Sequence, residues 1–544
     1  MNQDTGHPKR WRILAVLVGS LMAVIIDTTI LNVSLKTLAD PVAGLGATHS
    51  ELEWALSSYT LVFAALLFSW GVLADRAGRK RILLIGLALF GLASLASAYA
   101  QDPVQLIVAR SVMGLGAAAV MPCTLAIIAA VFPLQERAKA IGVWTAAIGV
   151  ALALGPVTGG LLLENFWWGS IFLINVPLVA LTILAVVLVV PESRAPYRRK
   201  LDIVGMLLSI AGLVLIVYGV IEGGRLASFT APLVWAPIAA GIVVLVLFVL
   251  HEKRIDQPAF DIGFFRKPAF TVAIAAVGFV SFAMAGFLFF SAFYLQSVRG
   301  YTPLQAGACM LALALAMMVF GPLSSKTAAR FGPKIVCSAA LLVVAAALGS
   351  LLLIEEQSPL AAILPVYFVL GTGIANVMPP AAVSIMMSIP REKAAVGSAM
   401  NNTMRQVGTA LGVAILGAVL GAVYRSEIDG DLGALPAAQR AAAGESIEAT
   451  LAVAQKAGGG APGLVDSARE SFVSAMHVSS LCAAIVALIG AAVVFRWFPG
   501  KQPAGNAWGG GNWGAGAAKP GQSWQPASKP DSETESAPVQ TGNH

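Results

Sequence analysis

The stretch ILAVLVGSLMAVIIDTTILNVSLK, residues 13–36, contains a single charged side chain, Asp27, before it ends at Lys36. A helix that crosses a bilayer needs about 20 mostly apolar residues, and this stretch is long enough. Comparable stretches recur along all 544 residues, of which 58% are hydrophobic and 12% charged. Soluble domains are about 25% charged, so the composition excludes a soluble globular protein. We predict an all-α integral membrane protein.

Fourteen stretches of this kind are bounded by charge, Gly or Pro, and each predicts a membrane-spanning helix. They cover residues 13–36, 52–73, 82–100, 104–131, 141–163, 168–190, 203–222, 233–250, 269–296, 304–325, 335–354, 359–388, 394–424 and 471–495. An even number of spans places both termini on one side of the membrane. No small-residue cleavage site follows the basic residues 1–12, which favours a first span over a removable signal.

The distribution of basic residues among the loops predicts the orientation of the chain. Lys and Arg crowd the loops on one side, whereas the short loops on the other side hold only Lys36, Arg225 and Arg299. Cytoplasmic loops are the ones enriched in Lys and Arg. We therefore expect a multi-pass protein of the bacterial cytoplasmic (inner) membrane with both termini in the cytoplasm. The net charge of +7 lies mainly in these loops, so nucleic acid is not an expected partner.

Two polar segments stand outside the predicted bundle. Residues 425–470 form a long external loop, with a helix expected around Pro436–Ala457 and a break at Gly458–Gly460, and this loop is placed to cover part of the external mouth. Residues 498–544 are rich in Gly, Pro, Ser and Gln, a composition that cannot bury a core. We expect a disordered, solvated cytoplasmic tail.

Motifs of enzymes and metal sites are missing from the sequence. It has no HExxH, no Gly-Lys-Ser/Thr phosphate loop and no His and Cys cluster with metal-ligand spacing. Its four cysteines lie in apolar stretches without a CxxC pair. We expect no metal, no cofactor and no direct drive by ATP. A membrane enzyme or a membrane sensor is a disfavoured alternative.

Charges within a span are few, and each costs on the order of 3 kcal/mol, so they are candidates for function. Asp27 and Arg110 are expected at matching depth, each roughly 9 Å from the external end of its span at a rise of about 1.5 Å per residue. Asp27 is the only acid expected well inside a span. An arginine beside a buried carboxylate favours the ionised form, so a movable pair acts as a proton-binding switch. The alternative is a static ion pair that fixes helix packing.

The loop GVLADRAGRKR, residues 71–81, sets one acid among four bases after the second span. Gly78 permits a tight turn, and Asp75 is expected to hold a basic residue or a helix N-terminus and so latch one conformation. Residues 321–334, at the matching place after the tenth span, are a second copy without the acid. The candidate latch residues are Gly71, Asp75, Arg76, Gly78 and Arg79.

Small residues gather in two further spans. In GVALALGPVTGG, residues 149–160, glycines allow close helix approach and a proline bends the helix near mid-membrane, which predicts a pivot. The residues concerned are Gly149, Gly155, Pro156, Gly159 and Gly160. Residues 397–412 are also Gly-rich and carry Asn401, Arg405 and Gln406. The two halves of the chain thus echo each other, as transporter repeats do.

Taken in order, these motifs resemble those of the fourteen-helix drug:proton antiporters of the major facilitator superfamily, the EmrB/QacA-like branch. The resemblance covers residues 12–497 and rests on residues 27–33 in the first span, 71–80 in the loop, Arg110 with 114–118 in the fourth span, and 149–160 in the fifth. Asn32, Asn175 and Pro177 also fit the pattern. The branch usually has Ala-Leu-Pro where this chain has Ser34-Leu35-Lys36, so the outer end of the first span is expected to differ.

The resemblance implies a major facilitator fold with two six-helix bundles and two extra transmembrane helices. The implied parts are a cytoplasmic N-terminus (1–12), the first bundle (13–190), the added pair with its linkers (191–268), the second bundle (269–497) and the tail (498–544). It also implies a cavity lined chiefly by spans one, four, nine and twelve. We interpret the aromatic and Met residues of those spans as packing or lipid-facing side chains: Phe282, Met284, Phe287, Phe290, Phe293, Met378 and Met386.

By this resemblance, the protein is a secondary active transporter and not an enzyme. It is expected to expel amphipathic drugs or other toxic compounds, and so to give antibiotic resistance, in exchange for protons. Asp27 would bind and release the proton, and Arg110 would adjust the pKa of Asp27. Asp75 would hold the protein in one conformation. The alternative is a dedicated exporter of an endogenous siderophore, lipid or peptide by the same mechanism. We expect a monomer in the lipid bilayer, and an envelope partner is not readable from the sequence.

Overall fold

The computed structural model describes residues 7–194, 202–226, 231–255, 262–389, 394–456 and 463–499, and within these ranges the chain is helical without a β-strand. All of them fall in one compact unit, residues 1–503. The all-α prediction is confirmed. The predictions for the tail after Pro499 and for the break at Gly458–Gly460 lie outside the described residues.

The helices follow the predicted spans closely. In chain order they are α1 (Arg10–Ala39), α2 (His49–Ala77), α3 (Arg79–Ala98), α4 (Pro103–Val131), α5 (Leu134–Asn165), α6 (Ser170–Leu173), α7 (Asn175–Val189), α8 (Ile203–Leu226), α9 (Pro232–Glu252), η1 (Ile262–Arg266), α10 (Pro268–Phe293), the π-helical turn η2 (Tyr294–Val298), α11 (Pro303–Phe331), α12 (Pro333–Ser350), η3 (Leu351–Leu353), α13 (Leu360–Met387), α14 (Ala394–Ile428), η5 (Asp431–Ala434), α15 (Ala437–Ala443), α16 (Ile447–Lys456) and α17 (Leu464–Trp497). The sixth predicted span is divided between α6 and α7.

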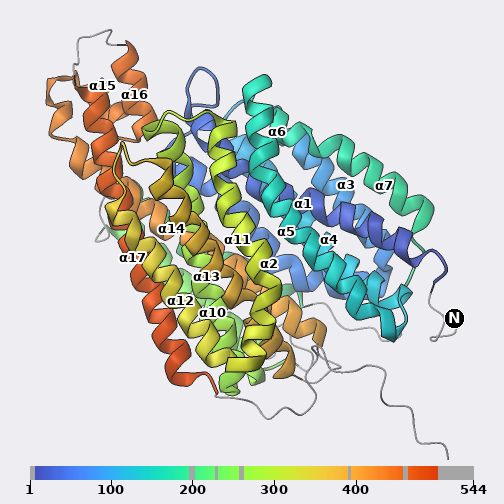
Figure 1. Cartoon of the computed structure of the whole chain (residues 1–544). Helices are drawn as coiled ribbons and strands as arrows, with labels where there is room; N and C mark the ends of the chain where they lie inside the picture. Colours follow the sequence, from blue (N-terminus) through green and yellow to red (C-terminus); the bar gives the residue numbers. More distant parts are fainter. Residues whose placement is uncertain are drawn as a thin grey trace, which may run out of the picture. The chain divides into compact units, whose positions relative to one another are not determined.

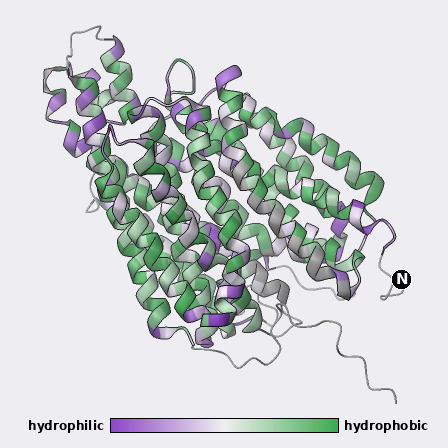
Figure 2. Cartoon of the chain, viewed as in Figure 1, coloured by the Kyte–Doolittle hydropathy of each residue, from purple (hydrophilic) through white to green (hydrophobic). Residues whose placement is uncertain are grey.

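The length and composition of these helices suit a membrane. Among the described residues, 12 helices are long and apolar enough to cross a bilayer, and a bent α2 makes up to 13. The predicted fifth span, α5, is not among these helices. It is a continuous helix of 32 residues, but many of its side chains lie outside the described part of the chain. Figure 2 shows apolar residues along the middle of most helices and polar residues mainly toward their ends.

Packing divides twelve of the predicted spans into two groups that repeat each other (Figure 1). In the first group, α1 packs on α5 and α7, α2 on α4, and α3 on α4 and α7. In the second group, α10 packs on α14 and α17, α11 on α13, and α12 on α13 and α17. Each contact in one group has its counterpart eight spans later in the other. This repetition is the packing of an internal repeat, as in many transporters.

The two groups meet through matching helix pairs. α2 packs on α14, and α5 packs on α11, so each group offers its second and fifth spans to the other. The added pair α8 and α9 pack on each other, and α8 also lies against α2 and α14. Close approach at α5 and α11 depends on a glycine, because a Cβ at Gly307 would clash with the carbonyl of Pro156. The boundaries predicted for the two bundles stay predictions.

Matching turns confirm the predicted second copy of the loop motif. Gly78 joins α2 to α3 with φ of 116°, and Gly332 joins α11 to α12 with φ of 88°. Both values lie in the left-handed range that residues with a Cβ rarely adopt. The two loops therefore share a backbone turn.

The long loop after α14 is more helical than predicted. The single helix expected around Pro436–Ala457 is replaced by α15 and α16, which are separated by a turn at Gly444–Glu445. Ser446 supplies the reason, because its Oγ accepts a hydrogen bond from the backbone of Ala449 and starts a new helix. α16 packs on α17 and touches α1, as expected of a loop that covers part of the mouth.

Candidate functional site

The two charges predicted at matching depth form an ion pair. Asp27 on α1 and Arg110 on α4 are both buried, and Arg110 Nη1 lies 2.5 Å from Asp27 Oδ2. A charge-assisted bond of this length is among the strong ones. The prediction that these residues share a depth is therefore confirmed as direct contact.

Asn175, another predicted residue, completes the carboxylate's environment. Its Nδ2 donates to Asp27 Oδ1 at 3.0 Å and lies 3.1 Å from Ser94 Oγ on α3. Both oxygens of Asp27 thus have a partner. Pro177 lies two residues later in the first turn of α7, where a missing N–H leaves no helix bond unmade. No sequence pattern singled out Ser94, which is one of many serines in apolar stretches.

Helix α2 makes two contacts with the guanidinium of Arg110. Arg110 Nε donates to the carbonyl of Ala55 at 3.3 Å, and the guanidinium lies 4.4 Å from the ring centroid of Tyr59. A Cβ at Gly114 would lie 2.5 Å from the Tyr59 carbonyl, so this glycine lets α4 approach α2 closely. Every partner of the Asp27–Arg110 pair therefore belongs to the first group of helices.

This arrangement is suited to binding and releasing a proton. Burial favours a neutral carboxyl, whereas a contacting arginine and an amide donor favour the ionised form. The balance depends on the short Asp27–Arg110 distance, so a small displacement of α1 against α4 changes the proton affinity. A buried ion pair is in itself a poor stabiliser, which favours a functional reason for the pair.

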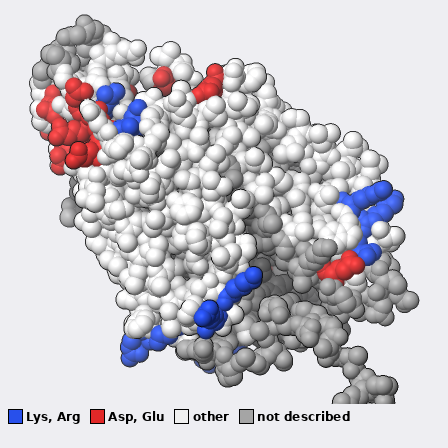
Figure 3. All heavy atoms as spheres, viewed as in Figure 1, with Lys and Arg blue, Asp and Glu red and all other residues white. Residues whose placement is uncertain are grey.

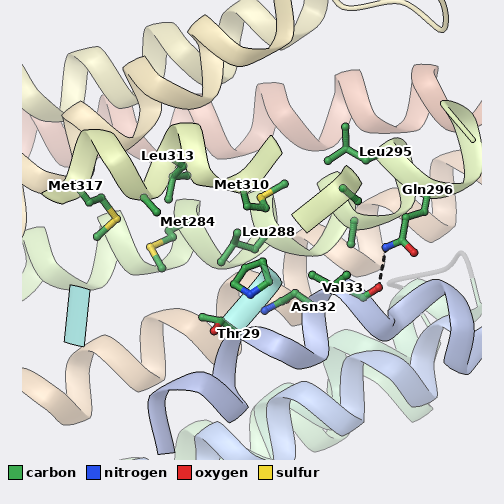
Figure 4. Close-up of a pocket in the computed structure, with 14 residues that line it drawn as sticks. Thr29, Asn32, Val33, Met284, Leu288, Leu295, Gln296, Met310, Leu313 and Met317 are labelled. Atoms are coloured by element: carbon green, nitrogen blue, oxygen red, sulfur yellow. Dashed lines mark hydrogen bonds between the residues drawn. The ribbon is translucent and has the colours of Figure 1, made fainter. Parts of the chain in front are cut away.

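A small cavity begins at Thr29, two residues along α1 from Asp27. It encloses about 50 Å³. Figure 4 shows the polar side chains of Thr29 and Asn32 from α1 facing Met284 of α10 and Met310 and Met317 of α11. Small-molecule sites usually measure about 300–1,000 Å³, so this cavity must widen before it can hold a drug-sized ligand.

The lining of this cavity corrects two expectations. Spans one and nine, α1 and α10, line it as the resemblance implied, but α5 and α11 take the places expected for spans four and twelve. The reason is the close contact of α5 and α11 between the two groups. Met284, interpreted from the sequence as a packing residue, lines the cavity. Phe287, Phe290 and Phe293 are buried, as packing residues are.

One end of the cavity is closed by bonds between the two groups. Gln296 Nε2 in η2 donates to the carbonyl of Val33 at 2.7 Å (Figure 4), and Lys36 Nζ donates to the carbonyl of Gln296 at 2.6 Å. Lys36 is the residue at which the sequence departs from the family motif. The departure therefore supplies a contact between α1 and η2.

The loop helix α16 adds to this closure. Ser297 Oγ in η2 donates to Glu448 Oε1 at 2.5 Å, and Glu448 is buried. Burial raises the pKa of Glu448, although the bond from Ser297 and the charge of Lys36 oppose the shift. In Figure 3 the acidic side chains on the visible face gather mainly over α15 and α16.

Residues of the predicted latch lie at the far ends of α2 and α3. Arg79 Nη2 lies 2.9 Å from Asp75 Oδ1, and Arg79 Nη1 donates to the carbonyl of Ala126 on α4 at 3.2 Å. Arg76 is exposed. The predicted basic partner of Asp75 is thus Arg79, four residues along, and the contact stays within the first group.

A residue that the motif did not reveal holds the turn of this loop. The carboxylate of Glu192 accepts from the backbone N–H of Lys80 at 3.1 Å and would lie 2.8 Å from a Cβ at Gly78. A side chain at position 78 would therefore displace the Glu192 carboxylate, in addition to straining the backbone at this φ. Gly71 makes only an ordinary contact with Pro122. Glu192 is too far along the chain for a local pattern to show it.

The small residues of α5 divide between two partners. A Cβ at Gly155 would clash with Thr29, and one at Gly159 would lie 2.6 Å from Ile30 Cγ1, so these glycines face α1. A Cβ at Gly160 would lie 2.5 Å from Leu304 Cα on α11. The motif with Pro156 thus lies where the two groups meet. The surroundings of Gly149 lie outside the described residues.

The candidates on α14 stand apart from the Asp27 pair. Gln406 is buried, Asn401 is half-buried, and Arg405 is half-buried without a carboxylate partner in the described part of the chain. The charge of Arg405 interacts with Tyr59, whose ring also contacts Arg110. The structure therefore brings Arg405 toward the site through one shared neighbour and leaves Asn401 and Gln406 outside it.

A second buried acid, which the sequence did not single out, lies near the start of α2. Glu53 lies in the second turn of α2 and is 1% exposed. The predicted span began at residue 52, which placed Glu53 at its edge. The helix in fact begins at His49, after a capping box formed by Thr48 and Glu51.

Comparisons with known proteins agree with this geometry. The family description "Major Facilitator Superfamily" matches residues 17–413. The chain is 36% identical to "Multidrug efflux pump LfrA" of Mycolicibacterium smegmatis, over 90% of this chain and 97% of that protein. It is 34% identical to "Multidrug resistance protein Stp" of Mycobacterium tuberculosis, over 72% of each chain. It is also 34% identical to "Puromycin resistance protein pur8" of Streptomyces alboniger, over 74% of this chain and 80% of that protein.

Solved structures share the fold at low sequence identity. A bacterial homologue of the human lysosomal transporter Spinster, in an inward-facing and occupied conformation, superimposes with a TM-score of 0.64 at 18% identity, covering 90% of this chain and 96% of that one. A D-xylose-proton symporter gives 0.59 at 13% identity, covering 90% and 98%.

Proposed function

This chain belongs to the Major Facilitator Superfamily, and we propose that it exports amphipathic drugs or other small toxic compounds in exchange for protons. It is a multi-pass membrane transporter, not an enzyme. One observation carries the proposal: a buried carboxylate with an arginine and an asparagine partner lies two residues along α1 from the wall of a Met-lined cavity. The names of its relatives favour drugs over a dedicated metabolite such as a siderophore, lipid or peptide.

Proton exchange at Asp27 would be linked to the cavity through α1. The same helix carries Asp27 and, two and five residues later, Thr29 and Asn32 of the cavity wall. A proton on Asp27 weakens its attraction to Arg110 and frees α1 to move against α4. A ligand in the cavity contacts the same helix. Binding of the proton and binding of the ligand would therefore each change the affinity of the protein for the other.

Two further motifs would govern the change of conformation. The glycines of α5 let it slide close to α1 and α11, and Pro156 gives this helix a bend. The Asp75–Arg79 pair fixes the turn between α2 and α3 against α4 and would be released in another state. No cofactor enters this mechanism, because the proton gradient drives it.

Transport by purified protein tests the proposal. In proteoliposomes that contain the full chain, puromycin movement should follow an imposed pH gradient and reverse when the gradient is reversed. The matched control for chemistry at Asp27 is Asp466→Asn, since Asp466 is exposed and far along the chain. Movement that ignores the gradient would contradict proton coupling.

Orientation is also part of the proposal: a monomer in the bacterial cytoplasmic membrane with both termini in the cytoplasm. The distribution of Lys and Arg supports it. Reporter fusions after Arg198 and in the tail should report cytoplasm, and a fusion at Gly458 should report the outside. A reversed signal at any of the three positions would contradict this topology.

A further inference from the structure

Glu53 is a buried acid that the proposed mechanism does not use. It lies on α2 one turn after His49, is 1% exposed, and its Oε1 has no hydrogen-bond partner among the residues that the structure describes. A buried polar group without a partner is costly, and a buried charge without one is far more costly. The feature therefore needs an explanation other than packing.

The neighbours of Glu53 come from the second group and from the added pair. On α14, a Cβ at Gly417 would clash with the Glu53 carboxyl, and Arg425 is the cation whose charge acts on it. Arg425 also donates to the carbonyl of Gly224 on α8, a helix that carries Glu222 two residues earlier.

The remaining contacts of this cluster are through His49. Its ring lies 5.0 Å from that of Phe289 and 6.0 Å from that of Phe293, so α10 offers aromatic rings there and no charge. Helix α4 carries the cation Arg110. Its guanidinium donates a hydrogen bond to the carbonyl of Ala55 and not to Glu53.

Hydrogen-bond chemistry favours a proton on Glu53 in this state. His49 Nε2 lies 3.0 Å from the carbonyl of Gly417 and 3.4 Å from Glu53 Oε1. Because a carbonyl can only accept, Nε2 carries a hydrogen that points to Gly417. His49 therefore donates its hydrogen bond to Gly417 and not to Glu53. Without a hydrogen-bond donor to its Oε1 in the described part of the chain, the Glu53 carboxyl is more stable in its neutral form here than as a carboxylate.

The position of Glu53 links this proton to conformation. α2 and α14 form one of the contacts between the two groups, at the end where Gln296 and Lys36 also close the cavity. Separation of the groups at this end exposes Glu53 to water, where the carboxylate is stable and the proton leaves. A proton therefore binds better to the closed state than to the open one, and it stabilises closure by linkage.

We infer that Glu53 and His49 form a second proton-binding site, distinct from Asp27, whose occupation holds the outer ends of α2 and α14 together. The inference rests on the proposed function in that it assigns this closure to a transport cycle. It implies that external acid drives the emptied exporter back toward the state that is closed outside.

A distance measurement on the full chain tests this site without any substrate. Val42 and Leu353 are highly exposed, lie in different groups, and are both expected on the external side. Spin labels at V42C and L353C, with Cys123, Cys309, Cys337 and Cys482 replaced by Ser, would report the separation of the two groups by pulsed electron resonance. The open-to-closed ratio should rise with pH by at most about tenfold per unit, since one proton is bound.

Glu53→Gln is the deciding variant, because the amide resembles a protonated carboxyl. It should remain closed outside at every pH, whereas Glu51→Gln, a matched change two residues from it, should keep the pH-dependent shift. The same shift in Glu53→Gln as in the unmodified sequence would overturn the inference.

A second variant covers the case in which Glu53→Gln does not fold. The Asp27→Asn variant should keep the pH-dependent distance change. If the distance in this variant no longer depends on pH, the proton binds at Asp27 and the inference is overturned. The outcome is separate from that of the proposed function. If Asp27→Asn still exports puromycin along a pH gradient, the coupling role of Asp27 fails while the distance result stands.

Discussion

Asp27 and Glu53 are both buried carboxyls on neighbouring helices, yet their surroundings differ in a way that separates their roles. Asp27 has partners on both oxygens, all within the first group of helices. Glu53 Oε1 accepts no hydrogen bond from the described residues, with only His49 Nε2 at 3.4 Å, and Glu53 lies where the two groups meet. The first environment stabilises a charge and the second a neutral group. A site that changes charge needs the first, and a site that senses closure needs the second.

The largest expected effect falls on export. Asp27→Asn should reduce gradient-driven puromycin movement to the rate of empty liposomes, because the amide cannot exchange a proton. Its shape resembles the protonated carboxyl, so folding should be nearly intact by size-exclusion chromatography. Asp466→Asn is the control and should transport normally. Substantial gradient-driven movement by the Asp27 variant would remove the difference drawn between the two carboxyls.

The next largest effect is on thermal stability, which should be lost more at the Asp27–Arg110 pair than at Glu53. Arg110→Ala leaves the Asp27 charge buried without its cation, a loss of about 3 to 5 kcal/mol in comparable pairs. Arg110→Lys should lose less, because it keeps a positive charge but not the planar fork. Glu53→Gln should change the unfolding free energy by about 1 kcal/mol or less, since it breaks no full hydrogen bond.

Unfolding temperatures of the three variants in one detergent would check this order. Equal losses for Arg110→Ala and Glu53→Gln would mean that both acids are static parts of the packing.

The Asp75 pair tests whether conformational latching is separable from proton exchange. Asp75→Asn should lower the turnover rate more than the affinity for puromycin, because it changes the balance of conformations and not the cavity. Initial rates over a range of concentrations would separate the two quantities. Asp102→Asn, at the start of α4, is a surface control of the same chemistry. An unchanged rate at normal expression would exclude the latch.

The smallest effect concerns Glu448, a third buried acid, which lies in the external loop. Burial raises its pKa above the usual 4.5, so the docked loop binds the proton more tightly than the undocked one. This contribution to docking is fully present below about pH 4.5 and is lost as the pH rises through the raised value. Deuterium exchange of α16, corrected for its intrinsic pH dependence, should therefore become faster at higher pH.

Glu448→Gln should remove most of that dependence, whereas the exposed Glu445→Gln should retain it. Identical exchange profiles for the two variants would show that Glu448 does not govern docking.

The matching depth of Asp27 and Arg110 was predictable, because helix geometry converts residue counts into depth. Their direct contact is a finding of the structure. The loop motif predicted a tight turn at Gly78 and a second copy of the loop around Gly332, and the structure adds that both glycines have positive φ. The sequence could not reveal Ser94 or Glu192, because their partners come from distant helices that a periodic pattern does not bring together.

Glu53 was missed for a different reason. Hydropathy sets the edge of a span where polar residues begin, and that rule placed Glu53 at the boundary. The capping box at Thr48 and Glu51 starts α2 earlier, and the second group of helices then covers Glu53. The sequence also did not predict that α5 and α11 line the cavity, because this depends on how closely the two groups of helices approach each other.

The most direct test of the central claim is substrate binding as a function of pH in nanodiscs. Puromycin affinity of the unmodified sequence should weaken as the pH falls, because a proton on Asp27 and the substrate bias α1 in opposite directions. Asp27→Asn should bind with an affinity that no longer depends on pH over the same range. If the variant shows the same pH-dependent shift, Asp27 is not the coupling group, and its pair with Arg110 is a static element of packing.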